Sequence, residues 1–227
     1  MTITRLFKLS SLVAATALAS TAAQAGPSYG NLSAPGVYFG AGNSNGNWNI
    51  GTDHGIELGL RAKERPSGNL LDGSTGTYFA DPGLYAGGGV KARWNYEFSF
   101  NIGERAYDGL TFRIGVDHDP SAAVSYSWAD PRTQWGDNAM VTLVPDGSNG
   151  FQNSQNVGFG GTPGGAFNVN QDGLYSFALE VRDATGALLD STTMNVQVGA
   201  VPEPETYALM LAGMVAVGFA ARRRAKP

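Results

Sequence analysis

The sequence of 227 residues contains no cysteine. Disulfide bonds are therefore excluded as a source of stability, and a cysteine nucleophile is excluded as well. Histidine is nearly absent, because His54 and His118 are the only two. A serine triad needs a histidine base, and no H-E-x-x-H or phosphate-loop motif occurs. The sequence therefore predicts a protein that is not an enzyme and that has no cofactor.

Basic residues are also few in the central part of the chain. The whole sequence has 15 Lys and Arg against 19 Asp and Glu, a net charge of −4. Residues 1–25 and 222–227 hold six of these cations and none of the acids, which leaves a net charge of −10 on the rest. Such a surface is unsuited to a nucleic-acid partner, which needs cations to neutralise phosphates.

The first 25 residues have the pattern of a signal peptide. Arg5 and Lys8 form a basic front, and an uncharged stretch rich in Ala, Leu and Val follows. It ends on a small-x-small site at Ala23 and Ala25, so signal peptidase is expected to cut before Gly26. The alternative, a buried N-terminal helix, explains neither the charge order nor the cleavage pattern. Residues 26–199 are then one exported domain.

Alternation with a period of two dominates that domain. It is clearest at residues 94–102, where five apolar side chains fall on one face and four polar ones on the other: Trp94, Tyr96, Phe98, Phe100 and Ile102 against Asn95, Glu97, Ser99 and Asn101. The same alternation occurs at residues 56–62, 110–116, 122–128, 175–181 and 194–198, and residues 140–144 form a shorter apolar run. The pattern predicts an all-β, antiparallel β-sandwich whose sheets bury one face and expose the other.

Two local signals bear on the type of sandwich. Residues 183–186 separate two strands and include Gly186, which indicates a hairpin. Residues 172–175 end on Tyr175 and resemble the tyrosine corner of immunoglobulin-like domains. A jelly-roll arrangement remains open as the alternative.

The end of the chain combines three features. Pro202, Glu203 and Pro204 form a stiff extended spacer, because each proline fixes φ and removes an N–H. Residues 206–221 are uncharged, and as a helix they would span about 24 Å at about 1.5 Å per residue. That is short for a hydrocarbon core of about 30 Å, which predicts a temporary membrane anchor. A basic cluster then holds the tail on the cytoplasmic side: Arg222, Arg223, Arg224 and Lys226.

Residues 200–227 resemble the PEP-CTERM sorting domain of Gram-negative bacteria, which has a Pro-Glu-Pro tripeptide, a short apolar helix and a terminal basic cluster in this order. The resemblance implies that exosortase, a membrane-embedded enzyme, processes the chain at or near Pro202, Glu203 and Pro204. It also implies an inner-membrane-anchored precursor and delivery to the cell surface or the exopolysaccharide matrix.

Two acidic residues are the best candidates for a metal site. Asp117 and Asp119 follow a strand and could give oxygen ligands to calcium. Turn formation is the favoured interpretation, because aspartates accept backbone N–H bonds and a calcium ion needs about six to eight oxygens. His54, beside Asp53 in a glycine-flanked turn, is interpreted as a loop residue.

Three tryptophans lie in or near turn-rich segments. Trp48, Trp128 and Trp135 could stack on sugars, because an indole has an apolar face and a hydrogen-bonding edge. Core packing is the favoured interpretation, since tryptophan is highly buried on average.

Three functions follow from these observations. The leading hypothesis is a non-enzymatic structural or adhesive component of the cell surface or exopolysaccharide matrix. The alternative is a carbohydrate-binding module for the exopolysaccharide. A secreted hydrolase with paired carboxylates is the third.

Overall fold

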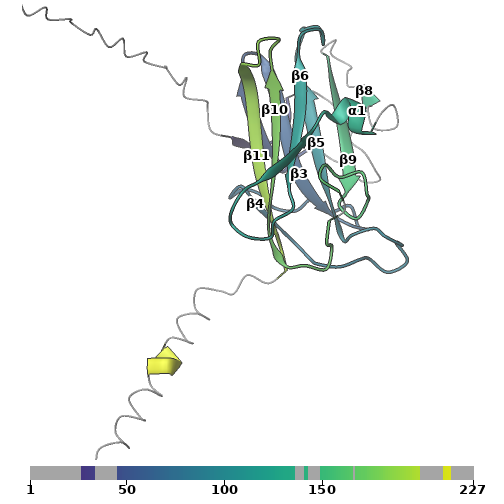
Figure 1. Cartoon of the computed structure of the whole chain (residues 1–227), viewed down its shortest axis with the longest axis vertical. Coiled ribbons are helices and arrows are strands. Elements are labelled where there is room, and N and C mark those ends of the chain that lie inside the picture. Colours follow the sequence, from purple (N-terminus) through teal and green to yellow (C-terminus); the bar gives the residue numbers. More distant parts are fainter. Residues whose placement is uncertain are drawn as a thin grey trace, which may run out of the picture.

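The computed structural model describes residues 27–33, 45–135, 141–142, 149–165, 167–199 and 212–215. Within these residues eleven strands form two sheets, shown in Figure 1. The first sheet has the order β1-β2-β3-β5-β9-β8, with β1 (Ser28–Gly30), β2 (Trp48–Asp53), β3 (Ile56–Glu64), β5 (Trp94–Asn101), β8 (Val141–Thr142) and β9 (Gly150–Asn156). The second has the order β4-β11-β10-β6-β7, with β4 (Thr77–Ala80), β6 (Thr111–Asp117), β7 (Tyr126–Ala129), β10 (Gly173–Arg182) and β11 (Leu188–Val198). A short helix, α1 (Pro131–Trp135), follows β7.

Most of the predicted strands are present. The alternating runs correspond to β3, β5, β6, β10 and β11, and the all-β class is confirmed. The run at residues 122–128 forms a strand only from Tyr126, because a bend occupies residues 121–123. The structure adds β1, β2, β4, β9 and α1, which the alternation did not predict.

One strand pair departs from the predicted antiparallel arrangement. β4 runs parallel to β11, with Thr77 opposite Asn195 and Ala80 opposite Val198. All the other pairs between strands in the described residues are antiparallel. The chain reaches β4 from β3 and returns to β5, both in the other sheet, so β4 is not paired through a tight turn. A strand added through such a long connection is free to run parallel.

Both local signals are confirmed. Gly186 has a φ of 85°, and Asp183 N donates to Ala187 O to close the β10–β11 hairpin. The Tyr175 hydroxyl donates to Gln171 O over 3.0 Å, the upstream backbone bond typical of a tyrosine corner. The choice between a jelly-roll and an immunoglobulin-like sandwich stays a prediction.

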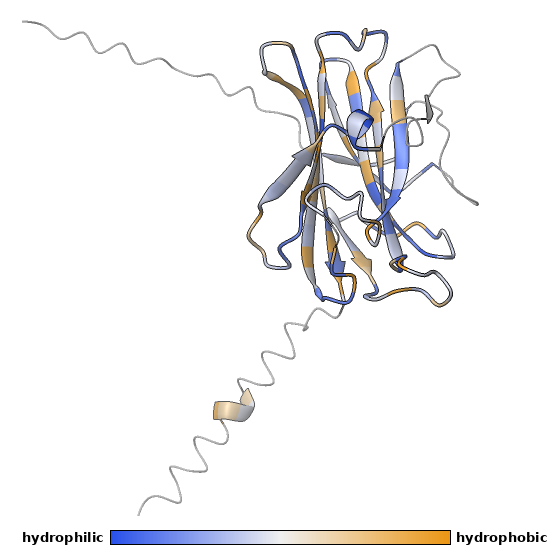
Figure 2. Cartoon of the chain, turned by 45° about the vertical axis from the view of Figure 1, so that its right-hand side comes forward, coloured by the Kyte–Doolittle hydropathy of each residue, from blue (hydrophilic) through white to orange (hydrophobic). Residues whose placement is uncertain are grey.

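The two sheets share one apolar core. Phe100 of β5 meets Phe112 of β6 edge to face at 5.5 Å, and Tyr96 of β5 lies 5.0 Å from Phe177 of β10. Figure 2 shows hydrophobic and hydrophilic residues alternating along the strands, as a sheet with two different faces requires. At Gly51 the sheets come so close that a Cβ would lie 2.4 Å from Ser191 O.

The predicted exposure of the second face is wrong for the six-stranded sheet. Asn95, Glu97 and Ser99 are at most 2% exposed, although they point away from the apolar core. These side chains are polar because they form hydrogen bonds and ion pairs within the protein, and not because they are exposed to water. Alternation identifies which side chains share a face, but it does not show whether another layer covers that face.

Gly73 gives the first testable prediction. The Tyr78 ring reaches across the core, where its hydroxyl donates to Asn47 O over 2.6 Å and to Leu60 O over 3.1 Å. A Cβ at Gly73 would lie 2.2 Å from this ring. We expect Gly73→Ala to lower the free energy of unfolding by about 1–3 kcal/mol, as overpacking does. Urea denaturation measures this, and Gly160→Ala is the control, because a Cβ added there would meet no atom within 4 Å. Equal stability of both variants would contradict the prediction.

Candidate functional site

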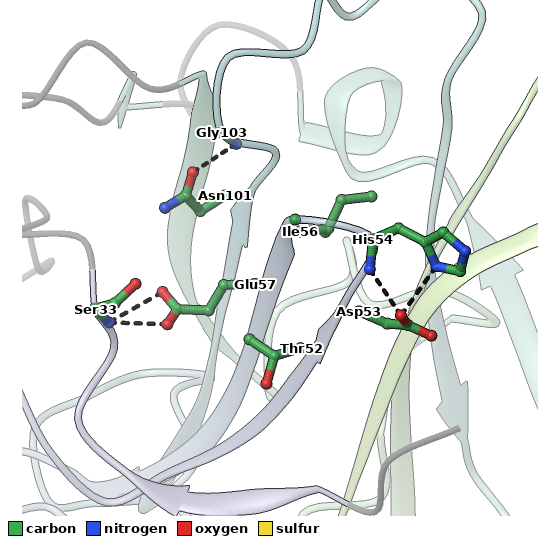
Figure 3. A pocket seen from close by; sticks show the side chains of 9 residues that line it. Ser33, Thr52, Asp53, His54, Ile56, Glu57, Asn101 and Gly103 are labelled. Carbon is green, nitrogen blue, oxygen red and sulfur yellow. Dashed lines mark hydrogen bonds and ion pairs between the residues drawn. The ribbon is translucent and has the colours of Figure 1, made fainter. Parts of the chain in front are cut away.

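An open pocket of about 490 Å³ lies at the turn between β2 and β3 (Figure 3). Pockets for small ligands commonly have volumes of about 300–1,000 Å³. Its polar lining comes from three separate parts of the chain, namely residue 33, the β2–β3 hairpin and residues 101–103 at the end of β5: Ser33, Thr52, Asp53, His54, Glu57, Asn101 and Gly103.

The turn that forms one wall has a defined geometry. Asp53 pairs with Ile56 across the hairpin, and the two residues between them have positive φ, 50° at His54 and 73° at Gly55. Positive φ at both central positions is the signature of a type I′ hairpin turn. Asp53 Oδ1 accepts a bond from His54 N over 2.7 Å, which supports the unusual φ of a residue with a side chain. The interpretation of His54 as a turn residue is therefore confirmed.

The His54 imidazole is oriented by its neighbours. Its Nδ1 lies 2.9 Å from Leu189 O and 3.1 Å from Asp53 Oδ1. These two acceptors favour the tautomer that carries its proton on Nδ1 and leaves Nε2 as an acceptor. The two partners of Nδ1 are thus a backbone carbonyl and a carboxylate, which are acceptors that orient an imidazole.

The opposite wall carries a second carboxylate. Both oxygens of Glu57 accept a bond from Ser33 N, over 3.1 and 2.9 Å. Asn101 Oδ1 accepts a bond from Gly103 N over 3.0 Å, and Asn101 lines the pocket at the end of β5. Carboxylate, hydroxyl and carboxamide groups together can hydrogen-bond the hydroxyl groups of a saccharide. Sequence reasoning identified only the turn, because the other lining residues are remote in the chain.

The outer face of the same sheet contains a network of buried charges. Glu97 Oε2 lies 2.6 Å from both Nε and an Nη of Arg61, and Glu97 Oε1 lies 2.6 Å from Lys63 Nζ. The three side chains are at most 3% exposed. Burial lowers the pKa of the Lys63 ammonium, although the charge of Glu97 opposes this shift. No sequence signal marked these residues as buried.

Asp117 and Asp119 organise a turn. Asp117 Oδ1 accepts from Asp119 N over 3.0 Å, and Asp119 Oδ1 accepts from Ser121 N over 2.9 Å. These bonds fit the turn interpretation. Among the described residues, no group of three or more His, Cys, Asp or Glu side chains is arranged to hold a metal ion. Calcium binding at the two aspartates stays the less favoured alternative.

We expect a chelator to leave the stability of the protein unchanged. If Asp117 and Asp119 serve only the turn, EDTA should not shift the Tm in a calorimetric scan. A ligand bound only to the native state raises its stability, so a Tm that falls with EDTA and recovers with calcium would overturn the turn interpretation. Magnesium added in place of calcium controls for ionic strength.

The three tryptophans have different surroundings. Trp48 is 1% exposed and packs under the Arg61 guanidinium, 4.1 Å from the ring centroid, so it presents no open face to a sugar. Trp128 is partly exposed, and the Arg113 guanidinium lies over its ring, 4.1 Å from the ring centroid. The centroids of the Trp128 and Tyr126 rings are 5.2 Å apart. The side chain of Trp135 lies outside the described residues. Neither Trp48 nor Trp128 lines the pocket of Figure 3.

The predicted sorting tail lies largely outside the described residues. Pro202, Glu203, Pro204 and the basic cluster all lie outside the described residues. The signal peptide and its cleavage site before Gly26 lie outside them as well. Only residues 212–215 of the tail are described, and they are helical and exposed. In the described ranges, no helix is both long enough and apolar enough to cross a membrane.

Comparison with known families identifies this tail. Residues 200–224 match the model of the PEP-CTERM protein-sorting motif. The curated proteins compared with the chain include no match. The chain thus carries a PEP-CTERM protein-sorting motif, which indicates an exported protein that exosortase recognises and directs to the cell surface.

Proposed function

We propose that the protein is a non-enzymatic structural or adhesive component of the cell surface or exopolysaccharide matrix. The PEP-CTERM motif at residues 200–224 carries this proposal, because it supplies the destination. The two-sheet body supplies a stable, acidic and cysteine-free module suited to the exterior of the cell. In this proposal the body is a β-sandwich.

The surroundings of His118 favour a role without catalysis. Its Nε2 lies 2.6 Å from Pro163 O, and its ring packs 4.8 Å from Phe167. This imidazole is thus held by a backbone carbonyl and an aromatic neighbour, as in packed loops.

The route to the surface has two steps. Signal peptidase removes residues 1–25, and residues 206–221 then hold the precursor in the inner membrane with Arg222, Arg223 and Arg224 in the cytoplasm. Exosortase cuts near Pro202, Glu203 and Pro204 and releases the body to the surface or matrix.

Deletion of the gene tests the role at the destination. We expect the deletion strain to lose matrix cohesion or surface adhesion, and the wild-type gene to restore it. The gene that encodes Glu203→Ala should not restore it, although it makes a folded body. A deletion strain whose matrix and adhesion are indistinguishable from the wild type would contradict the structural role.

The pocket at the β2–β3 turn favours a second candidate function, saccharide binding. The observation that supports it is a hollow lined by Thr52, Asp53, Glu57 and Asn101, whose polar groups match sugar hydroxyls. This would place the ligand at the pocket, away from the tryptophans.

A pull-down with purified matrix polysaccharide tests this candidate. The polysaccharide should retain much less of the double variant, Thr52→Ala with Asn101→Ala, than of the wild-type protein. Asn170→Ala, an exposed asparagine outside the pocket, is the matched control. Binding that is equal in all three proteins would exclude the pocket as the saccharide site.

A hydrolase screen of the full chain tests the third hypothesis. Release of reducing sugar by the wild-type protein, lost on substitution of Asp53 or Glu57, would replace the non-enzymatic proposal.

A further inference from the structure

Three polar residues form a row across the outer face of the six-stranded sheet. Lys63 of β3 is opposite Asn95 of β5, and Asn95 is opposite Asn156 of β9. All three side chains point away from the apolar core, and their exposed fractions are 1%, 1% and 3%. Side chains directly opposite each other in antiparallel strands are neighbours, with Cβ atoms about 4.5–5.5 Å apart. The side chains of Lys63, a primary amine, and Asn95, a carboxamide, therefore start from neighbouring positions in a site shielded from water.

The amine has the surroundings of a nucleophile. Burial lowers the pKa of Lys63, which increases the share of neutral amine, the form whose lone pair can attack a carbonyl carbon. Glu97 Oε1 lies 2.6 Å from Lys63 Nζ, close enough to accept its proton. Arg61 binds the other oxygen, Oε2, and so fixes the direction of the carboxylate.

The carboxamide is held and polarised by β9. Asn95 Oδ1 accepts a bond from Asn156 Nδ2 over 2.7 Å, and Asn95 Nδ2 donates to Ser154 Oγ over 2.8 Å. Asn156 is itself fixed, since its Oδ1 accepts from Ala92 N over 2.7 Å. A donor already in place at the carbonyl oxygen stabilises the negative charge that develops there when a nucleophile attacks the carbon.

We propose that Lys63 and Asn95 join through an intramolecular isopeptide bond, with Glu97 transferring the proton. The Lys63 Nζ lone pair attacks Cγ of Asn95, and a new C–N bond forms. Glu97 takes a proton from Nζ and passes it to Nδ2, the Cγ–Nδ2 bond breaks, and the nitrogen leaves as ammonia. An amine and a primary amide give a secondary amide and ammonia, so the step needs no oxidant, reductant or cofactor. This inference is independent of any ligand of the body.

The bond would link β3 to β5 and close the chain between residues 63 and 95. A covalent link of this kind restricts the unfolded chain, as a disulfide bond does. It would give a cysteine-free exported protein a cross-link that thiol chemistry cannot provide.

Peptide mapping by mass spectrometry tests the bond. The folded, purified full chain is digested, and peptides that contain Lys63 and Asn95 should appear as one joined species about 17 Da lighter than their sum, the mass of ammonia. Lys63→Arg should abolish the joined species, because a guanidinium does not acylate. Lys91→Arg, at an exposed lysine, is the matched control and should retain it.

Two further variants separate chemistry from folding. Glu97→Gln keeps the shape of the side chain but cannot take the proton, so the fraction of this variant that is folded by circular dichroism should show at least a tenfold loss of joined peptide. Asn95→Asp replaces the leaving ammonia by water, so its joined species should be lighter by about 18 Da instead of about 17 Da. Separate, unjoined Lys63 and Asn95 peptides throughout the folded wild-type protein would overturn the proposal. Joining that persists in Lys63→Arg would also overturn it.

Discussion

Substitution of Glu203 by alanine is expected to keep the whole precursor in the inner membrane, with residues 206–227 still attached. Prolines on both sides of this glutamate, Pro202 and Pro204, predict from the sequence an extended backbone, the form that a protease-like enzyme binds. Removing the carboxylate takes away the one charge of the tripeptide. Mass spectrometry of the membrane and surface fractions measures the result, and we expect nearly complete loss of surface material.

Glu205→Ala provides the matched control, because it removes an equal charge just outside the tripeptide. In a strain without exosortase, the wild-type protein should also stay in the inner membrane with residues 206–227 attached. An ordinary tail anchor would instead give the same fractionation with and without exosortase. Wild-type surface material that still ends at Pro227 would contradict processing altogether.

Removal of the Arg61 side chain is expected to destabilise the body by about 3–5 kcal/mol, the usual effect of breaking a buried ion pair. Arg61 is fully buried, donates to Glu97, and donates to Gly46 O over 2.9 Å. Its loss leaves the Glu97 carboxylate with less compensation in a site where water does not reach it. Urea denaturation of Arg61→Ala measures the change in the free energy of unfolding.

Arg182 offers a control with the same bonding pattern. Its Nε donates to Glu180 Oε2 over 2.9 Å, and an Nη donates to Gly186 O over 2.9 Å, but its side chain is 29% exposed. Water replaces these bonds when the side chain is removed, so Arg182→Ala should cost about 0–1 kcal/mol. Comparable losses in the two variants would show that burial does not control the strength of these pairs.

The strands that could be predicted from the sequence are those with one apolar face. β5 and β10 alternate without interruption, and the structure contains both. β9 (Gly150–Asn156) was missed because its last five residues, from Gln152 to Asn156, are all polar. β2 (Trp48–Asp53) was missed because Gly51 interrupts its pattern. Gly51 is required there by the close approach of Ser191, a contact between remote parts of the chain.

The candidate site was less predictable than the fold. The positive φ of Gly55 is visible as a turn signal, and so His54 was interpreted correctly. Glu57 and Asn101 carry no local signal, since strand pairing alone places them together across β3 and β5. The same pairing places Lys63 beside Asn95, and period-two alternation cannot reveal it without the register.

The parallel contact between β4 and β11 has a mechanical consequence. The sorting motif begins directly after Gly199, so a pull on an attached tail would act on the end of β11. This strand lies inside its sheet, with β4 on one side and β10 on the other. The force on β11 would therefore be shared by two rows of hydrogen bonds. These bonds would be loaded along the strand axis and would have to break together, whereas the bonds of an edge strand that is pulled away sideways break one at a time. The body is thus built to resist shear at the point where its attachment would apply it.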